Sequence, residues 1–257
     1  MRCVDLNSDL GESFGVYVIG NDEEMLKIIT SANVACGFHA GDPLVMHKTL
    51  VLAKENSVGI GAHPGFIDLW GFGRRPIHGE RPEDVEKIVI YQIGALQAMA
   101  HSLGLRVWHF KAHGSLGNMA AVDPDLAMAC ACAARSADRD MIFVVLPGSE
   151  LEKAGEKLGL RIAREVFADR AYDDEGNLVS RKIDGAVIHD PEVAVPRIIR
   201  MLADNEIVSV NGKRIPVKID SICVHGDNPA AVTLSAKIRK ALSAAGVTLK
   251  PLAEFVA

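Results

Sequence analysis

The sequence is poor in aromatic residues and cysteines and has no long apolar run, and each shortage excludes a class of protein. Phe, Trp and Tyr make up 5% of the 257 residues, so there are few platforms for stacking sugar rings. Five cysteines are too few for a disulfide scaffold in a chain of this length, so we expect reduced thiols and a cytoplasmic protein. No apolar run approaches the roughly 20 residues of a membrane span. The start MRCVDLNSDLGE has acids where a signal peptide needs its apolar stretch.

An excess of positive charge is also absent. The formal charge is −5 and the isoelectric point is about 6.0, so the chain has no electrostatic footprint for nucleic acid or an anionic membrane. No GxxxxGK[ST] phosphate loop occurs, and Gly59-x-Gly61 opens no predicted helix. Any nucleotide therefore needs an unconventional site or another subunit. Small molecules or other proteins are the expected partners.

The chain does contain a regular rhythm: a short apolar run, a loop rich in Gly, His and Asp, then a longer helical pattern. Strands are predicted over residues 3–7, 32–36, 58–62, 107–111, 141–145, 161–166 and 219–224. Helices are predicted over residues 21–30, 43–56, 82–103, 123–137, 149–157, 191–204 and 229–245, and several open with an acid–proline pair. Such alternation predicts a parallel sheet, and seven repeats favour an α/β fold with a single seven-stranded β/α barrel over residues 1–257. An open doubly wound sheet is the alternative.

One segment departs from this rhythm. Residues 207–219 (IVSVNGKRIPVKI) read as a β-hairpin inserted before the last strand. Asn211 and Gly212 are predicted to form its type I′ turn.

Four of the nine histidines follow predicted strands, and each has a glycine within two residues. They are His39, His63, His113 and His225. In a β/α barrel these loops emerge on one rim, where catalytic groups converge, and a glycine beside each His lets a ligand approach. A single such His is as easily a loop cap, but four together favour a site. His109, two residues deeper than Lys111, is expected in the core, and His47, His78, His101 and His189 are expected on helices or the surface.

Charged residues near the strand ends complete the candidate site. Asp9 and Glu12 follow the first strand and are interpreted as a base and a metal ligand, with a strand-end cap as the alternative. Lys111 either reaches the barrel mouth or lies at the surface. Arg74, in the motif GFGRR, belongs either to a solvated loop or to a clamp for carboxylate or phosphate. Asp169 and Arg170 follow the sixth strand.

Other chemistries have weaker support. Ser115 is a poor nucleophile candidate because His113 occupies the first glycine position of a G-x-S-x-G motif. Cys36 is interpreted as a core residue, and no Cys/His spacing marks a structural zinc site. A catalytic divalent metal held by Asp9, His39 and His63 from three strand ends is a further hypothesis.

Long blocks of the sequence resemble the LamB/YcsF family. They are VDLNSDLGESFG, ANVACGFHAGDP, GAHPGFIDLWGFGRR, FKAHGSLGNMA, EVFADRAYDDEGNLVSR and SICVHGDNP, which run in the family's order from about residue 4 to 229. The resemblance implies a seven-stranded β/α barrel similar to the glycoside hydrolase and deacetylase barrels. It also implies ATP-dependent hydrolysis of 5-oxo-L-proline to L-glutamate, with the chain as the A component of a 5-oxoprolinase, two partner subunits and ATP as cofactor.

The same resemblance implies a set of site residues. It adds Asp42 and Asp227 to the charged residues above, so that the catalytic candidates are Asp9, Glu12, His39, His63, Lys111, His113 and His225, and the candidates for binding substrate or phosphate are Asp42, Arg74, Asp169, Arg170 and Asp227. The chain departs from the usual K-P-H-G-A-L-Y-N pattern at Ala112, Ser115 and Gly117, and from a usual proline at Ser180. The change at Gly117 predicts the loss of an aromatic wall.

Two other functions stay open at this point. One is a metal-dependent amidase or deacetylase that acts alone on a modified sugar, although the shortage of aromatic residues argues against a sugar substrate. The other is a non-catalytic subunit that binds 5-oxoproline while a partner performs the chemistry.

Overall fold

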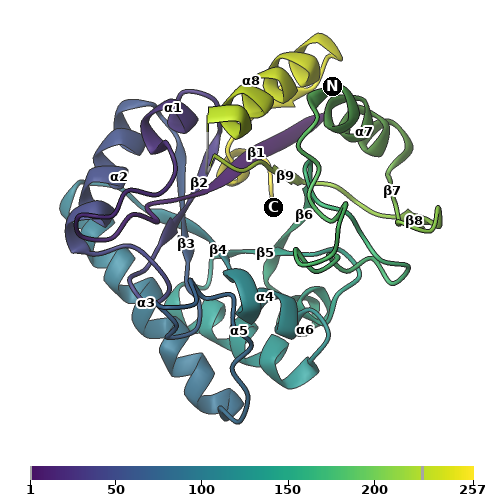
Figure 1. Cartoon of the computed structure of the whole chain (residues 1–257). Coiled ribbons are helices and arrows are strands. Elements are labelled where there is room, and N and C mark those ends of the chain that lie inside the picture. The colour runs from purple at the N-terminus through teal and green to yellow at the C-terminus, as the bar shows by residue number, and fades with distance from the viewer. Residues whose placement is uncertain (1, 227–228) are drawn as a thin grey trace.

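The computed structural model describes residues 2–226 and 229–257, and seven parallel strands in it close into a barrel (Figure 1). In chain order these strands are β1 (Cys3–Leu10), β2 (Ser31–Ala35), β3 (Gly59–His63), β4 (Val107–Lys111), β5 (Ile142–Val145), β6 (Arg161–Phe167) and β9 (Ser221–Cys223). Strand β9 pairs in parallel with both β6 and β1, which closes the sheet. The predicted seven-stranded barrel is therefore confirmed, and the open doubly wound sheet is excluded.

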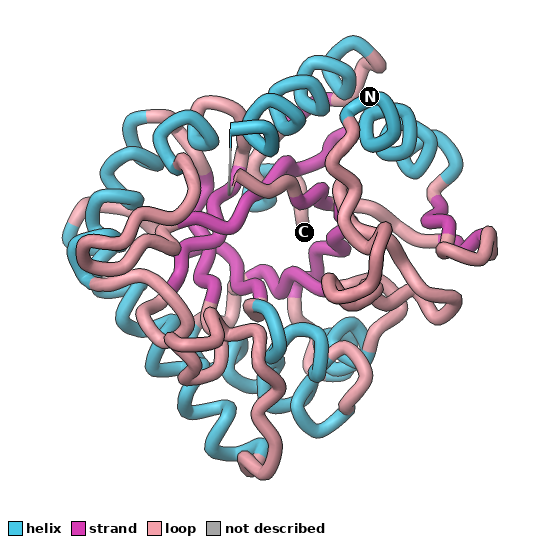
Figure 2. Tube along the Cα trace, in the orientation of Figure 1, coloured by secondary structure: helices cyan, strands magenta, loops and turns pink. Residues whose placement is uncertain are grey.

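Helices surround the barrel on the outside, as Figure 2 shows. They are α1 (Asp22–Leu26), α2 (Pro43–Glu55), α3 (Pro82–Ser102), α4 (Gly114–Ala120), α5 (Pro124–Ala137), α6 (Glu150–Lys157), α7 (Pro191–Asp204) and α8 (Pro229–Ala244). The acid–proline starts are confirmed where Asp42, Asp123 and Asp190 each accept backbone N–H bonds as N-caps. Within the described residues, no helix is both long enough and apolar enough to cross a membrane.

Three local predictions need correction. The predicted helix 21–30 ends at Leu26 as α1, because the chain must turn before β2 begins at Ser31. Helix α4 was not predicted, since its seven residues contain two glycines and show no helical apolar period. Strand β1 runs on to Leu10, so Asp9 lies within the strand.

The predicted hairpin is present, but its turn differs. Strands β7 (Glu206–Val208) and β8 (Arg214–Pro216) pair in antiparallel fashion outside the barrel (Figure 1). Gly212 has a φ of +84°, whereas Asn211 does not have a positive φ. A type I′ turn needs positive φ at both central residues, so that prediction was wrong. The loop is longer, and Ser209 N–H donates to the Lys213 carbonyl across it.

The barrel interior is unusually polar. Asp5 accepts hydrogen bonds from Ser221 Oγ at 2.5 Å and from Thr30 Oγ1 at 2.7 Å. One layer higher, the Asn7 side-chain amide donates to Glu165 Oε1 at 2.8 Å. Buried polar groups of this kind are stable only when they are hydrogen-bonded, so β1 is tied to the strands on both sides of it.

The bottom of the barrel is closed by the C-terminal segment. Strand β10 (Thr248–Leu249) pairs with the start of β1, and the 3₁₀ helix η1 (Leu252–Glu254) follows it. Leu252 and Val256 pack against the apolar interior residues Ile142, Val144 and Ala163. The amino-terminal end of the barrel is thus filled, and the functional groups gather at the other end.

Candidate active site

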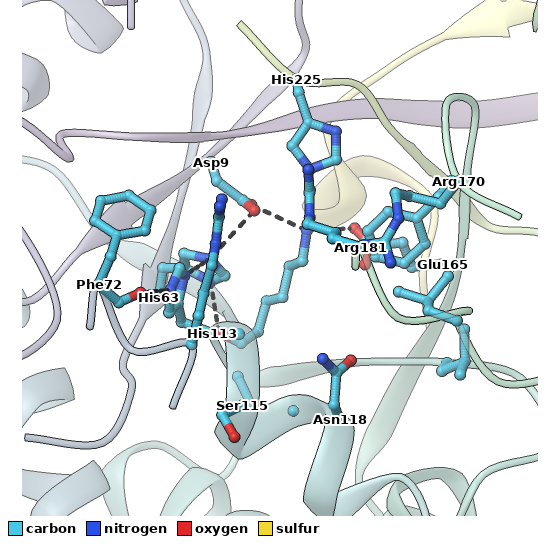
Figure 3. Close-up of a pocket in the computed structure, with 18 of the residues that line it drawn as sticks. Asp9, His63, Phe72, His113, Ser115, Asn118, Glu165, Arg170, Arg181 and His225 are labelled. Atoms are coloured by element: carbon cyan, nitrogen blue, oxygen red, sulfur yellow. Dashed lines mark hydrogen bonds and ion pairs between the residues drawn. The ribbon is translucent and has the colours of Figure 1, made fainter. Parts of the chain in front are cut away.

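A cavity of about 690 Å³ opens at the carboxyl ends of the barrel strands. Figure 3 shows the side chains that converge in it. Eight of the residues predicted from the sequence line this cavity: Asp9, Glu12, His63, Arg74, Lys111, His113, Arg170 and His225. The structure therefore brings together side chains from β1, β3, β4 and the loops that follow β6 and β9.

Lys111 lies between two carboxylates in the barrel mouth. Its Nζ is 2.9 Å from Asp9 Oδ1 and 2.9 Å from Glu165 Oε1, and only 7% of its side chain is exposed. Burial alone would lower the pKa of Lys111, but the carboxylates of Asp9 and Glu165 raise it well above the usual value. Lys111 is thus a buried, permanently charged ammonium, and the surface-lysine alternative is excluded.

Asp9 is held as a carboxylate by its neighbours. Asn33 Nδ2 donates to Asp9 Oδ1 at 2.9 Å, and His63 Nε2 lies 3.3 Å from Asp9 Oδ2. Burial would raise the pKa of Asp9, but the His63 ring and the Lys111 ammonium hold it well below the usual value. The group is therefore a fixed negative charge rather than a strong base.

His63 and His113 form a pair whose ring nitrogens face each other. His63 Nδ1 lies 2.8 Å from the Lys111 carbonyl, and His113 Nε2 lies 2.8 Å from the Phe72 carbonyl, so each of these outer nitrogens carries a proton. The nitrogens that face each other, His63 Nε2 and His113 Nδ1, are 3.0 Å apart and share a hydrogen bond when one of the two rings carries a second proton. Gly73 permits the close approach of its loop to His113 and His39, because it has a φ of +62° and a Cβ there would lie 2.6 Å from the His113 ring and 2.7 Å from His39 Cβ.

Glu12 lines the cavity next to this pair, and His39 is buried behind it. Glu12 Oε1 is 3.6 Å from both His39 Nε2 and His113 Nδ1, and burial raises the pKa of Glu12. His39 is fully buried and stacks on His113, with ring centroids 3.5 Å apart. Neither of its ring nitrogens has a hydrogen-bond partner among the described residues. Burial holds the pKa of His39 well below its usual value.

Two groups of side chains within the described residues offer enough donor atoms for a metal ion. Glu12, His39 and His113 form one group, and Asp9, Cys223 and His225 form the other. The predicted trio of Asp9, His39 and His63 is divided differently, since His39 faces Glu12 rather than Asp9. Nitrogen and carboxylate donors are the kind that zinc and similar ions take. The parallel stack does not aim His39 and His113 at one point, so a shared ion requires one ring to turn.

His225 belongs to a second cluster on the far side of Lys111. Its Nδ1 lies 2.6 Å from Asp169 Oδ2, and Arg181 Nη2 lies 3.1 Å from its Nε2. Burial would lower the pKa of His225, but Asp169 raises it. Arg181 can only donate, so Nε2 is unprotonated while this contact exists. The His225 ring is thus neutral while Arg181 contacts it, although Asp169 makes the ring more basic than it would otherwise be.

The remaining predicted residues lie at the edge of the cavity or outside it. Arg74 is exposed, with its guanidinium 5.0 Å from the centre of the Phe72 ring. Asp42 caps α2 and also accepts the Gly15 N–H at 2.7 Å, which places it outside the cavity. Arg170 is buried and donates to the Val179 carbonyl. Asp227 lies outside the described residues.

The histidines and the cysteine that the sequence analysis placed outside the site lie in the core or at the surface, as predicted. His109 is buried, and its Nε2 contacts Asn33 Oδ1 at 2.8 Å; its ring fills the space beside Gly61, and burial lowers its pKa to about 3. Cys36 is a buried core residue. His47, His78, His101 and His189 are exposed.

Four side chains that shape the site were not among the site residues predicted from the sequence. Asn7, Asn33 and Glu165 hold Lys111 and Asp9 in place from inside the barrel, and Arg181 reaches His225 from a loop. A polar residue at an inward position of a core strand is the signal that could have found the first three. Arg181 lies far along an irregular loop, and its signal is that it ends the block EVFADRAYDDEGNLVSR, which carries part of the family resemblance.

The model of the LamB/YcsF family matches residues 4–257 of this chain. The chain belongs to the LamB/YcsF family. It is 54% identical over 250 residues to a protein from Rhodopseudomonas palustris that is named as the A subunit of 5-oxoprolinase, with 97% of this chain and 98% of the relative covered. The crystal structure of a lactam utilization protein from Thermus thermophilus superposes with a TM-score of 0.91 at 42% identity, over 97% of this chain and 99% of that one.

A more distant structure supports the fold alone. The catalytic domain of a peptidoglycan N-acetylglucosamine deacetylase from Eubacterium rectale has a TM-score of 0.51 at 9% identity, with 98% of this chain and 88% of that chain covered. The predicted likeness to deacetylase barrels is confirmed at this level.

The departure at Gly117 has a structural correlate. A Cβ at this position would lie 2.8 Å from the Ala112 carbonyl oxygen. The tyrosine that the family resemblance led us to expect here would therefore require the backbone after β4 to shift. The changes at Ala112 and Gly117 thus affect the same contact.

Proposed function

We propose that this chain is one subunit of a 5-oxoprolinase, which hydrolyses 5-oxo-L-proline to L-glutamate in an ATP-dependent reaction. The observation that carries the proposal is the buried Lys111, held between Asp9 and Glu165 beside the His63–His113 pair. Such a site offers fixed charge and proton-transfer groups together, which amide hydrolysis needs. The names of the relative from R. palustris and of the T. thermophilus protein support the same substrate class.

The chemistry explains the use of ATP. A five-membered lactam is an unreactive amide, and phosphorylation of its carbonyl oxygen makes the carbon electrophilic. Water then adds to this carbon, and the C–N bond breaks as the nitrogen takes a proton, which leaves an acyl phosphate. A second water hydrolyses the acyl phosphate, so that phosphate leaves and the carboxylate of glutamate remains. The nitrogen leaves readily only when it is protonated, so the site needs both a base and an acid.

The geometry favours particular roles for the named residues. Glu12 is the proposed base for water, because it faces the cavity and is not ion-paired with Lys111, whereas Asp9 is. Lys111 and Arg74 are proposed to hold anionic groups of the reacting molecule. His113 or His225 is proposed to protonate the ring nitrogen, and His225 can do so only when Arg181 has left its Nε2 and that nitrogen carries a proton.

ATP and the partner subunits belong to the finer part of the proposal. We place the nucleotide on a partner subunit, since the sequence has no phosphate-binding glycine loop. The lettered subunit name of the relatives supports the presence of further subunits, and two are proposed here. The chain is proposed to act as one domain, and its five free cysteines favour a cytoplasmic location.

The deciding experiment measures glutamate release from 5-oxoproline by the chain alone and with its partner subunits, each with and without ATP. Release that needs both ATP and the partners supports the proposal. Replacing Glu12→Gln or Asp9→Asn should then abolish release while the far-UV circular dichroism stays unchanged. Absence of release from an assembled complex with ATP would remove 5-oxoproline as the substrate. Assembly with tight 5-oxoproline binding, and full activity of both variants, would instead favour a non-catalytic binding subunit.

A metal-dependent amide hydrolase, acting alone, is the second candidate function. The observation that favours it is His39, whose buried ring nitrogens have no partner among the described residues and whose Nε2 faces Glu12. A divalent ion on Glu12, His39 and His113 would polarise a substrate carbonyl. Amide hydrolysis without ATP that is lost with a chelator and restored by zinc would support this function over the first.

A further inference from the structure

The arginines of the cavity share their side of it with carboxylates. In Figure 3, Arg170 and Arg181 lie on one side of the cavity, and Glu165 is labelled on the same side. The carboxylate of Asp169 contacts the same His225 ring as Arg181 does. What each arginine can offer an anionic ligand therefore depends on the groups that it already contacts.

The cations of the cavity differ in what already engages them. Lys111 is paired with two carboxylates, and Arg170 donates to the backbone carbonyls of Val179 at 2.6 Å and Ala186 at 3.4 Å. Arg181 instead makes one hydrogen bond within the described residues, to the uncharged Nε2 of His225. Among the described residues, no carboxylate lies within ion-pair distance of Arg181. A guanidinium has five N–H donors, so Arg181 can receive an anion in bidentate fashion.

The segment that carries Arg181 is anchored on both sides. The two carbonyls that Arg170 binds, those of Val179 and Ala186, flank residues 180–185. Arg197 of α7 in turn donates to the carbonyls of Phe167, Ala168 and Arg170. A cation on an anchored loop loses little conformational entropy when it binds an anion, which is the arrangement that specific recognition requires.

We propose that Arg181 binds the carboxylate of the substrate and thereby selects a carboxylated lactam over the same lactam without the carboxylate. The proposal rests on the proposed function and names the specificity residue of that site. The planar fork of Arg181 matches a carboxylate, and the donors that His225 does not use remain available for it. Arg74, at the opposite edge of the cavity, is then left for the phosphate group.

The test compares 5-oxoproline with 2-pyrrolidinone, which has the same ring and no carboxylate, in the assembled complex with ATP. Replacing Arg181→Gln should raise KM for 5-oxoproline by roughly 10- to 100-fold with little change in kcat, as expected when a charged hydrogen bond to the substrate is lost. The rate with 2-pyrrolidinone should stay unchanged. Arg181→Lys keeps the charge but not the planar guanidinium, so its KM for 5-oxoproline should lie between those of the wild type and of Arg181→Gln. Arg200→Gln removes the same charge from the exposed face of α7 and should match the wild type.

The outcomes separate the two proposals. A wild-type complex that does not open 5-oxoproline refutes the proposed function. A wild-type complex that does open it, with an unchanged KM in a folded Arg181→Gln variant, refutes the role of Arg181 alone. An equal loss of activity towards both lactams would also refute it, because Arg181 would then act on something other than the carboxylate. Calorimetric binding of 5-oxoproline to the same variants checks that the KM change reflects affinity.

Discussion

Replacing Asp5→Asn should make the protein's stability less dependent on pH. Asp5 is fully buried inside the barrel, where the hydroxyls of Ser221 and Thr30 donate to its carboxylate. Burial raises the pKa of Asp5 from 3.8 to about 6, although the hydroxyl donors oppose the rise. The ionised form is therefore disfavoured in the folded protein.

The magnitude follows from the shift in pKa. One pKa unit corresponds to about 1.4 kcal/mol, so a rise of roughly two units makes ionised Asp5 cost about 3 kcal/mol in the folded state. The folded-state pKa is higher than the unfolded-state pKa. The contribution of Asp5 to the free energy of unfolding is therefore fully present below about pH 4 and is lost as the pH rises through about 6. Asparagine has no proton to lose, so the variant lacks this dependence.

The assay is urea unfolding followed by far-UV circular dichroism, for both proteins, between about pH 4 and pH 8. Other titrating groups are common to both proteins, so their effects cancel in the difference in unfolding free energy. From the low to the high end of this pH range, the unfolding free energy of Asp5→Asn should increase by about 3 kcal/mol relative to that of the wild type. Asp125→Asn, at the exposed start of α5, should show no such change. A shift of less than about 1 kcal/mol would refute the reasoning.

Three further perturbations have definite expected results. Gly61→Ala should lower the melting temperature, because the added Cβ would overlap the His109 ring. The control Gly94→Ala lies in open space on α3 and should stabilise the protein by up to about 1 kcal/mol. Equal melting temperatures of the two variants would contradict this expectation. Lys111→Met should lower the unfolding free energy by roughly 3–5 kcal/mol and abolish turnover, because two buried carboxylates lose their counter-charge; unchanged urea midpoints would count against it. Arg197→Gln removes the hydrogen bonds that hold the loop between β6 and α7, so this loop should become sensitive to limited proteolysis and the KM for 5-oxoproline should rise. A loop that stays uncut would show that these hydrogen bonds are dispensable.

The fold was predictable because its signals are local and repeated. Each strand is a short apolar run, and each long helix has a start signal or a clear period, as with Asp123 before α5. Helix α4 was missed because it is stabilised by its place after β4 rather than by its own sequence. The hairpin turn was assigned wrongly because Asn211-Gly212 is compatible with more than one loop, and the longer one forms here.

The candidate site was predictable in part. Convergence on one rim follows from the parallel barrel, so His63, His113 and His225 could be placed together before their contacts were known. The partners of each side chain could not, because Glu165 and Asp9 meet at Lys111 from opposite parts of the chain. Asp42 illustrates the converse, since its carboxylate follows a strand but caps a helix and accepts a backbone N–H of another loop, outside the cavity.

The closure of the barrel constrains the order in which the protein can fold. The Ser221 hydroxyl and the Asp5 carboxylate it contacts are 216 positions apart, and β1 also pairs with β10 near the end of the chain. During synthesis the first strand emerges long before either partner on that side exists. Until then β1 has an open edge, and its interior face is wet. Ring closure over most of the chain length is expected to be slow, and a product truncated before β9 has two exposed edges, on β1 and β6, that can pair with other chains.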